Sequence, residues 1–153
     1  MDFIYSLHPK AVAVIHADSK QAILEQLSSR FAQVYELDQA DVLERIEERE
    51  KLGSTGFGRG VAIPHARVPG LARPVAAFLR LDHPVEFDSA DGMPVEMVFG
   101  LLSPENAGAV HLQALAAVSR LFRNESVRDV LIHANDAEAI YALLNNVTDR
   151  DAA

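Results

Sequence analysis

The segment Val95-Glu96-Met97-Val98-Phe99-Gly100-Leu101-Leu102 is almost continuously apolar. A strand with one face in water alternates apolar and polar residues, whereas a strand covered on both faces is apolar nearly throughout. We therefore predict that residues 95–102 form a strand at the centre of a sheet. This prediction limits the fold more than any other feature of the sequence, because other elements of the chain have to cover both faces of that sheet.

The rest of the chain supplies candidates for the sheet and for its covering layers. Short apolar runs predict further strands at 11–17, 61–63, 74–81 and 85–87. Apolar residues spaced three and four apart, with capping residues before them, predict helices at 20–35, 39–52, 108–122, 126–132 and 136–144. We therefore predict an α/β fold: a mixed, partly parallel and partly antiparallel sheet of roughly five strands, with helices on both faces. The length fits a single domain, placed at residues 1–148, followed by a frayed tail at 149–153.

Helical spacing also predicts which side chains are buried. The helix at 39–52 is expected to turn its charged residues, Glu50 among them, toward water and to bury Val42, Leu43, Ile46 and Leu52. The helix at 108–122 is expected to bury Leu112, Leu115, Ala116, Ser119 and Phe122. For the last helix, Asn135 is the predicted N-cap, with Glu138 three residues later in the position of a capping box.

Composition excludes several classes of function. The formal net charge of −8 argues against nucleic-acid binding, which needs a basic surface to neutralise phosphates. The chain contains no cysteine, so it has neither disulfides nor a thiolate nucleophile or metal ligand. We find no run apolar and long enough to enter a membrane, and we expect a cytoplasmic protein.

The segment 53–65, Gly-Ser-Thr-Gly-Phe-Gly-Arg-Gly-Val-Ala-Ile-Pro-His, holds four of the eight glycines. Glycine-rich backbone can turn consecutive N–H groups toward one point, which suits an anion such as phosphate. A histidine held next to such a loop indicates phosphoryl chemistry. His65, at the end of this segment, is therefore the first candidate functional residue.

Two familiar nucleotide-binding motifs do not match this loop. A Walker A motif requires Lys and then Ser or Thr after Gly58, and the chain has Arg59-Gly60 there. A dinucleotide-binding fingerprint requires glycine at position 61, where Val61 stands, and a loop that leads from a strand into a helix. The sequence therefore indicates neither ATP nor dinucleotide binding, and we predict no cofactor.

The stretch from Arg49 to His65, with Leu-Gly-Ser-Thr-Gly before Ile-Pro-His, resembles the signature of the EIIA domains of the bacterial phosphotransferase system. The resemblance is to the fructose, mannitol and nitrogen-regulatory type of EIIA. It extends through Glu86-Phe87-Asp88 and the apolar strand to a histidine, His111, that opens a helix. In this family the histidine of the Ile-Pro-His motif accepts a phosphoryl group from an HPr-like carrier. The resemblance assigns that role to His65.

The chemistry of the residues agrees with this role. A neutral imidazole attacks phosphorus near pH 7 if its tautomer is fixed, and donors aimed at the phosphoryl oxygens lower the barrier. Arg49 offers a planar charged fork for the phosphate, and Ser54, Thr55 and the Gly56 amide are candidate donors in the loop. His111, near a helix N-terminus, is expected to face His65 and to assist. Phe57 is a candidate contact for the partner protein, and His65 is expected in a shallow exposed depression.

Three functions remain open at this point. Nitrogen-regulatory members commonly have Gly-Lys after Pro-His and His-Leu-His on the helix, where this chain has Ala66-Arg67 and His111-Leu112-Gln113. A free-standing domain nevertheless favours a regulatory EIIA phosphorylated by an HPr-like donor. The alternatives are a sugar-specific EIIA that passes phosphate to an EIIB, and a binding module with a vestigial histidine. We predict no metal site, since the spacing of His8, His16, His83 and His133 suggests no ligand set.

Overall fold

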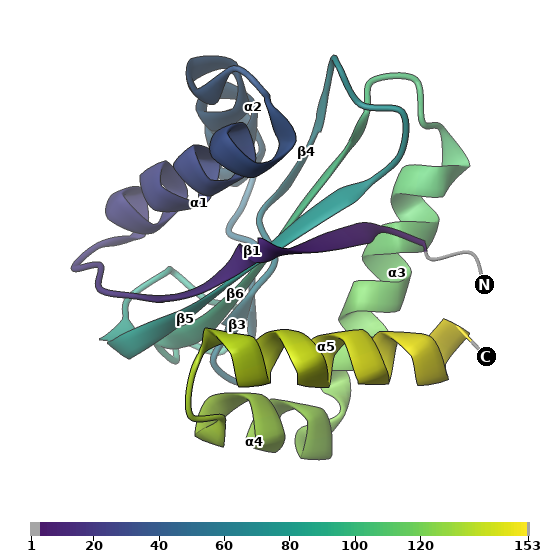
Figure 1. Ribbon diagram of the computed structural model, residues 1–153. Coiled ribbons are helices and arrows are strands. Elements are labelled where there is room, and N and C mark those ends of the chain that lie inside the picture. Colours follow the sequence, from purple (N-terminus) through teal and green to yellow (C-terminus); the bar gives the residue numbers. More distant parts are fainter. Residues whose placement is uncertain (1–3, 153) are drawn as a thin grey trace.

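The computed structural model describes residues 4–152 and has three layers, with helices on each side of a central sheet (Figure 1). The strands are β1 (Ser6–Ile15), β2 (Gly56–Gly58), β3 (Val61–Ala62), β4 (His65–Val68), β5 (Val75–Val85) and β6 (Val95–Pro104). The helices are α1 (Lys20–Tyr35), α2 (Gln39–Lys51), α3 (Ala109–Arg123), α4 (Glu125–His133) and α5 (Ala137–Ala152). None of these helices is long and apolar enough to cross a membrane.

The sheet is mixed, as predicted, and among the described residues it has six strands in the order β1-β5-β6-β3-β2, with β4 also paired to β6. β1 runs parallel to β5, and β3 and β4 run parallel to β6. β5 and β6 are antiparallel neighbours. β6 thus has partners on both sides, so the prediction that residues 95–102 lie at the centre of the sheet is confirmed.

β6 sends alternate side chains into two separate cores. Val98 and Leu102 join the core beneath α1 and α2. Phe99 and Leu101 join the core beneath α3, α4 and α5. A Cβ added to Gly100 would lie 2.8 Å from side-chain atoms of both Leu27 and Phe31, so the glycine lets α1 pack directly on the strand. Burial on both faces accounts for the unbroken apolar run.

Several strand boundaries differ from the predictions. β1 begins at Ser6, earlier than predicted, and residues 86–87 lie outside any strand because β5 ends at Val85. Residues 56–58, predicted as part of a loop, form β2, which makes a hairpin with β3, and β3 lies within the strand predicted at 61–63. At the turn of this hairpin Arg59 and Gly60 both have positive φ, of 60° and 80°, as in the tight turns that suit the twist of a hairpin. β4 is a further strand that the apolar runs do not predict.

The helices also correct several predictions of burial. α3 has the predicted periodicity but a rotated face: Leu112 is 63% exposed and Ala116 is exposed, whereas Phe122 is buried as expected. The buried positions of α3 are His111, Ala114, Ala117, Val118, Leu121 and Phe122. Leu115 and Ser119 are half-buried. Four of the buried positions, at 111, 114, 118 and 121, each precede a predicted one by a single residue, so the observed face is turned by about 100°.

The ends of two helices, α2 and α5, also differ from the predictions. α2 ends at Lys51, and Leu52 beyond it is 84% exposed, so the prediction that Leu52 is buried was wrong. At the start of α5, Asp136 Oδ1 accepts the backbone N–H of Ala139 at 2.8 Å, so Asp136 takes the capping role predicted for Asn135. α5 continues to Ala152, past the predicted end at residue 144, and residue 153 lies outside the described residues.

Candidate functional site

His65 is the first residue of β4, held in place by pairing with Leu101 of β6. Its Nδ1 lies 2.8 Å from the carbonyl oxygen of Ile63. A carbonyl only accepts, so this bond assigns the ring hydrogen to Nδ1 and leaves the lone pair on Nε2. Arg49 donates from Nε to that lone pair at 3.2 Å. Both ring nitrogens therefore have partners that define the neutral tautomer of His65.

Arg49 reaches His65 from the last turn of α2. Its Nη1 also donates to the carbonyl oxygen of Gly53, at 2.8 Å. The guanidinium is therefore anchored at one edge by the start of the glycine segment and meets the imidazole at another. This bridge places a permanent positive charge beside Nε2, the ring nitrogen that carries the lone pair.

His111 lies in the first turn of α3 and faces His65. The two ring centroids are 5.8 Å apart, with the rings tilted by 49°. Only 6% of His111 is exposed, and its Nδ1 lies 2.7 Å from Oγ of Ser103 on β6. The structure thus brings together the three residues predicted for chemistry, His65, His111 and Arg49, from β4, α3 and α2.

The surroundings favour the neutral form of both imidazoles. Burial lowers the pKa of His65 below its ordinary value of 6.5, and the charge of Arg49 adds to this, while the Ile63 carbonyl and Glu50 oppose it. Burial, followed by the charges of His65 and Arg67, lowers the pKa of His111 to about 4. At pH 7 both rings are therefore uncharged, and His65 retains its nucleophilic lone pair.

The lowered pKa of His111 predicts a pH-dependent stability. Because its pKa is about 4 in the folded protein and 6.5 in the unfolded chain, the unfolded chain takes up the proton first as the pH falls. The free energy of unfolding should therefore be unaffected by this group above pH 6.5 and should decline progressively toward pH 4, by at most about 3 kcal/mol. Denaturant unfolding measured across this range should show a smaller decline for His111→Gln. Equal declines for the two proteins would contradict the assignment.

Ser54, Thr55 and Gly56 hold the glycine segment in place. Ser54 Oγ donates to the carbonyl oxygen of Phe87 at 2.7 Å and accepts the N–H of Gly56 at 3.0 Å. Thr55 donates from both its backbone N–H and its hydroxyl to the carboxylate of Glu50. These donors are already bonded within the protein, and the phosphate-binding role proposed for them stays a prediction.

Gly56 is also required for a close approach of two segments. A Cβ there would lie 2.5 Å from Oγ and 3.0 Å from Cα of Ser89. The carbonyl oxygen of Gly56 accepts the N–H of Ala90 at 2.9 Å. The glycine segment is thus fastened to the chain that follows β5.

Glu50 is a site residue that the sequence reasoning placed wrongly. Predicted to face water, it is 8% exposed, and its carboxylate binds Thr55 and lies 2.9 Å from Nζ of Lys20. Val42, Ile46 and Glu50 follow one another at four-residue intervals, which puts them on one helix face. This spacing was the feature of the sequence that could have predicted the burial of Glu50. The ion pair between Lys20 and Glu50 links α1 to α2, and the bonds from Thr55 to Glu50 link α2 to the glycine segment.

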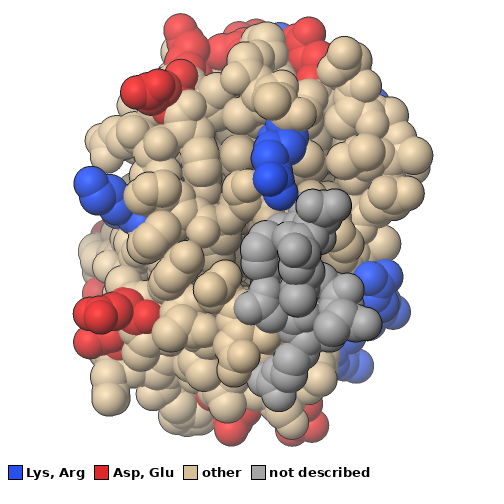
Figure 2. Space-filling view, turned by 45° about the vertical axis from the view of Figure 1, so that its right-hand side comes forward, with Lys and Arg blue, Asp and Glu red and all other residues tan. Residues whose placement is uncertain are grey.

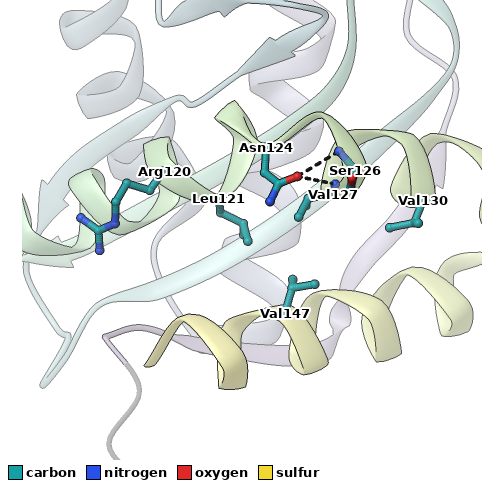
Figure 3. Close-up of a pocket in the computed structure, with 7 residues that line it drawn as sticks. All are labelled: Arg120, Leu121, Asn124, Ser126, Val127, Val130 and Val147. Carbon is teal, nitrogen blue, oxygen red and sulfur yellow. Dashed lines mark hydrogen bonds between the residues drawn. The ribbon is translucent and has the colours of Figure 1, made fainter. Parts of the chain in front are cut away.

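Phe57 is half-buried and packs against the core beneath α3 to α5, so it is less exposed than its predicted contact role implies. A cavity of about 290 Å³ lies among α3, α4 and α5. Figure 3 shows residues of its wall, Arg120, Asn124 and Val147 among them. None of the predicted site residues lines it.

On the face shown in Figure 2, Lys and Arg side chains are scattered and form no basic patch.

Comparisons with known proteins agree with this architecture. The family described as "Phosphoenolpyruvate-dependent sugar phosphotransferase system, EIIA 2" matches residues 6–147. A nitrogen regulatory protein of Bradyrhizobium diazoefficiens is 43% identical over 137 residues, which are 89% of this chain and 90% of that protein. One of Pseudomonas aeruginosa is 42% identical over 139 residues, 90% of each chain. The crystal structure of nitrogen regulatory protein IIA-Ntr from Neisseria meningitidis has a TM-score of 0.83 and 40% identity, and the match covers 90% of this chain and 95% of that one.

The chain therefore belongs to the EIIA type-2 family of the phosphoenolpyruvate-dependent sugar phosphotransferase system. Phosphotransfer is the general activity of this family, whose members accept phosphate from phosphocarriers and pass it to an EIIB or to regulatory targets. Within the family, this chain is similar to the nitrogen regulatory proteins, as its sequence signature predicts.

Proposed function

We propose that this protein accepts a phosphoryl group on Nε2 of His65 from an HPr-like phosphocarrier and acts as a regulatory EIIA of the nitrogen type. The observation that carries the proposal is the tautomer of His65. The Nδ1 hydrogen is held by the Ile63 carbonyl, and the lone pair lies on Nε2 beside Arg49. A nucleophile with its proton already on the other nitrogen needs no general base to attack phosphorus.

The transfer itself is an exchange of one nitrogen–phosphorus bond for another. The Nε2 lone pair of His65 forms the new bond while the bond from phosphorus to the donor's histidine breaks, and that histidine keeps the electron pair. Negative charge on the equatorial oxygens is stabilised by Arg49, whose fork releases the lone pair of Nε2 as the phosphoryl group arrives. The bond from Nδ1 to Ile63 holds the ring in place throughout.

His111 supports the reaction as a neutral donor. When the hydroxyl of Ser103 donates to Nδ1 of His111, the ring hydrogen is on Nε2 and is available to an oxygen of the phosphoryl group. A pKa of about 4 keeps the ring in this uncharged form at neutral pH. We therefore assign His111 an assisting role, with His65 as the acceptor.

The regulatory function rests on the resemblance to nitrogen regulatory proteins over nearly the whole chain. The second candidate, a sugar-specific EIIA, uses the same His65, but the phosphoryl group then moves on to an EIIB. In the regulatory function, the phosphorylation state itself changes how the protein binds its targets. The two functions therefore differ in the fate of the phosphate.

A label-and-chase experiment separates the candidates. The protein is incubated with labelled phosphoenolpyruvate, enzyme I and an HPr-like protein, and is then mixed with EIIB domains of the fructose and mannitol type. We expect acid-labile, alkali-stable label on this protein that persists during the chase. Rapid transfer to an EIIB would favour the sugar-specific function instead. Failure to acquire label would support a binding module with a vestigial histidine.

A further inference from the structure

Two histidines and two aspartates converge where β1 and β5 end, on a part of the molecule that the phosphotransfer site does not use. His16 follows β1, Asp82 and His83 lie near the end of β5, and Asp18 precedes α1. The rings of His16 and His83 lie side by side, with centroids 4.8 Å apart and planes tilted by 37°. No local pattern predicts this arrangement, because the two histidines are far apart along the chain.

The carboxylate of Asp82 joins the two rings at the same edge. Its oxygens lie 3.0 Å from Nδ1 of His16 and 2.7 Å from Nδ1 of His83. Three potential ligand atoms, one from each of His16, Asp82 and His83, lie within 4.8 Å of one another. Two imidazole nitrogens and a carboxylate oxygen that meet in this way are a donor set for a transition-metal ion.

Asp18 provides a second, independent feature of metal sites. Its carboxylate lies 3.1 Å from Nε2 of His16 and 3.6 Å from Nε2 of His83, on the side of the rings away from Asp82. An imidazole that binds metal through one nitrogen normally donates its other N–H to a carboxylate or a carbonyl, which fixes the tautomer. Asp18 is placed to accept that hydrogen from His16, so that Nδ1 is left free to bind metal.

The backbone holds these residues in register. Parallel pairing of Ile15 with Leu81 places His16 beside Asp82. The side chain of Gln26 donates to the carbonyl oxygen of His16 at 2.7 Å. Asp18 is followed directly by Ser19, which caps α1 by accepting the N–H of Ala22. The donor set therefore lies on a rigid part of the fold, as a preformed site requires.

We propose that His16, Asp82 and His83 bind a divalent transition-metal ion, with Asp18 orienting the ring of His16. Zn²⁺ fits this donor set better than Mg²⁺ or Ca²⁺ does, because it accepts mixed nitrogen and oxygen ligands, whereas Mg²⁺ and Ca²⁺ prefer oxygen alone. The side chains of His16 and Asp82 are 60% and 49% exposed, so the ion is reached from solvent and water completes its coordination.

This site is separate from the phosphotransfer site. His65 pairs with Leu101 on β6, and Leu101 in turn pairs with Ala76 on β5, so Ala76 marks the level of His65 along β5. The proposed metal ligand Asp82 lies farther along β5. At the rise of an extended strand, Ala76 and Asp82 are roughly 20 Å apart. Zinc binding at the proposed site can therefore be measured on the unphosphorylated protein, and its outcome does not depend on the role proposed for His65.

Calorimetric titration of Zn²⁺ into the metal-free protein tests the proposal. We expect one equivalent to bind, and His16→Gln, His83→Gln and Asp82→Asn each to weaken binding by at least about tenfold. None of these side chains is part of the buried core, and circular dichroism should show that each variant is folded. His133→Gln is the matched control, because His133 also lies beside a carboxylate, 3.4 Å from Asp129, but without a second histidine. It should bind zinc as the wild type does.

Two results would overturn the proposal. One is the absence of zinc binding by the wild-type protein. The other is binding that survives His16→Gln and His83→Gln but is lost in His65→Gln, which would place the ion between His65 and His111. The ¹⁵N resonances of the histidine side chains give an independent location, since zinc should shift those of His16 and His83 and leave those of His65 in place.

Discussion

We expect His65→Ala to abolish phosphorylation by an HPr-like donor, with the rate of labelling reduced by at least about three orders of magnitude. The substitution removes the Nε2 lone pair that Arg49 and Ile63 orient. His111 cannot take over, because its ring is buried and held by Ser103. The measurement is intact-protein mass spectrometry after incubation with phosphoenolpyruvate, enzyme I and the donor.

His133→Ala is the control for this experiment, since it removes an exposed histidine near the end of α4. It should be labelled at the wild-type rate. His65→Gln tests whether the loss reflects chemistry rather than packing, because glutamine retains much of the volume of histidine without a nucleophilic nitrogen. An acid-labile, alkali-stable phosphate on either His65 variant would disprove the assignment of the acceptor.

The second large effect is expected for Arg49→Gln, which should slow transfer by about 10²- to 10³-fold, as the loss of a donor to a developing oxyanion does in other enzymes. Arg49→Lys should recover only part of the rate, because an ammonium supplies charge without the planar fork that binds His65 and Gly53 together. Single-turnover labelling by rapid quench measures both rates.

Arg49→Gln should also change the pH dependence of labelling. The charge of Arg49 helps to lower the pKa of His65, so its removal raises that pKa, and the variant should lose activity at a higher pH than the wild type does. Lys51→Gln removes an exposed positive charge from the same helix end and should leave both rate and pH profile unchanged. An unchanged rate in Arg49→Gln would show that the arginine only secures the loop.

The central strand could be predicted from the sequence, and His65 could be singled out as a candidate, because both signals are local. An apolar run on β6 indicates directly that both faces are covered, and the motif that ends at His65 is continuous in the chain. The conformation of the glycine segment was harder to predict. Arg59 and Gly60 turn a hairpin and Gly56 allows the approach of Ser89, and the binding of an anion by the loop amides stays a prediction.

Features that depend on distant contacts were beyond a local interpretation. Glu50 is buried because Lys20, on another helix, neutralises it. His111 is buried because the face of α3 that packs against the sheet begins at this residue and not at Leu112. The meeting of His16 with His83 requires the parallel pairing of β1 with β5, which no pattern within either strand specifies. In each case the decisive partner lies far away in the sequence.

The pairing of β1 with β5 has a consequence for the synthesis of the protein. β1, α1 and α2 leave the ribosome before β5 and β6, yet Ser6 pairs with Val75, and α1 packs over Gly100. The first third of the chain therefore emerges with its apolar faces uncovered and cannot fold until the central strands have followed. Chains released before Pro104, where β6 ends, should be recognised by chaperones or degraded, whereas completed chains should fold in one cooperative step.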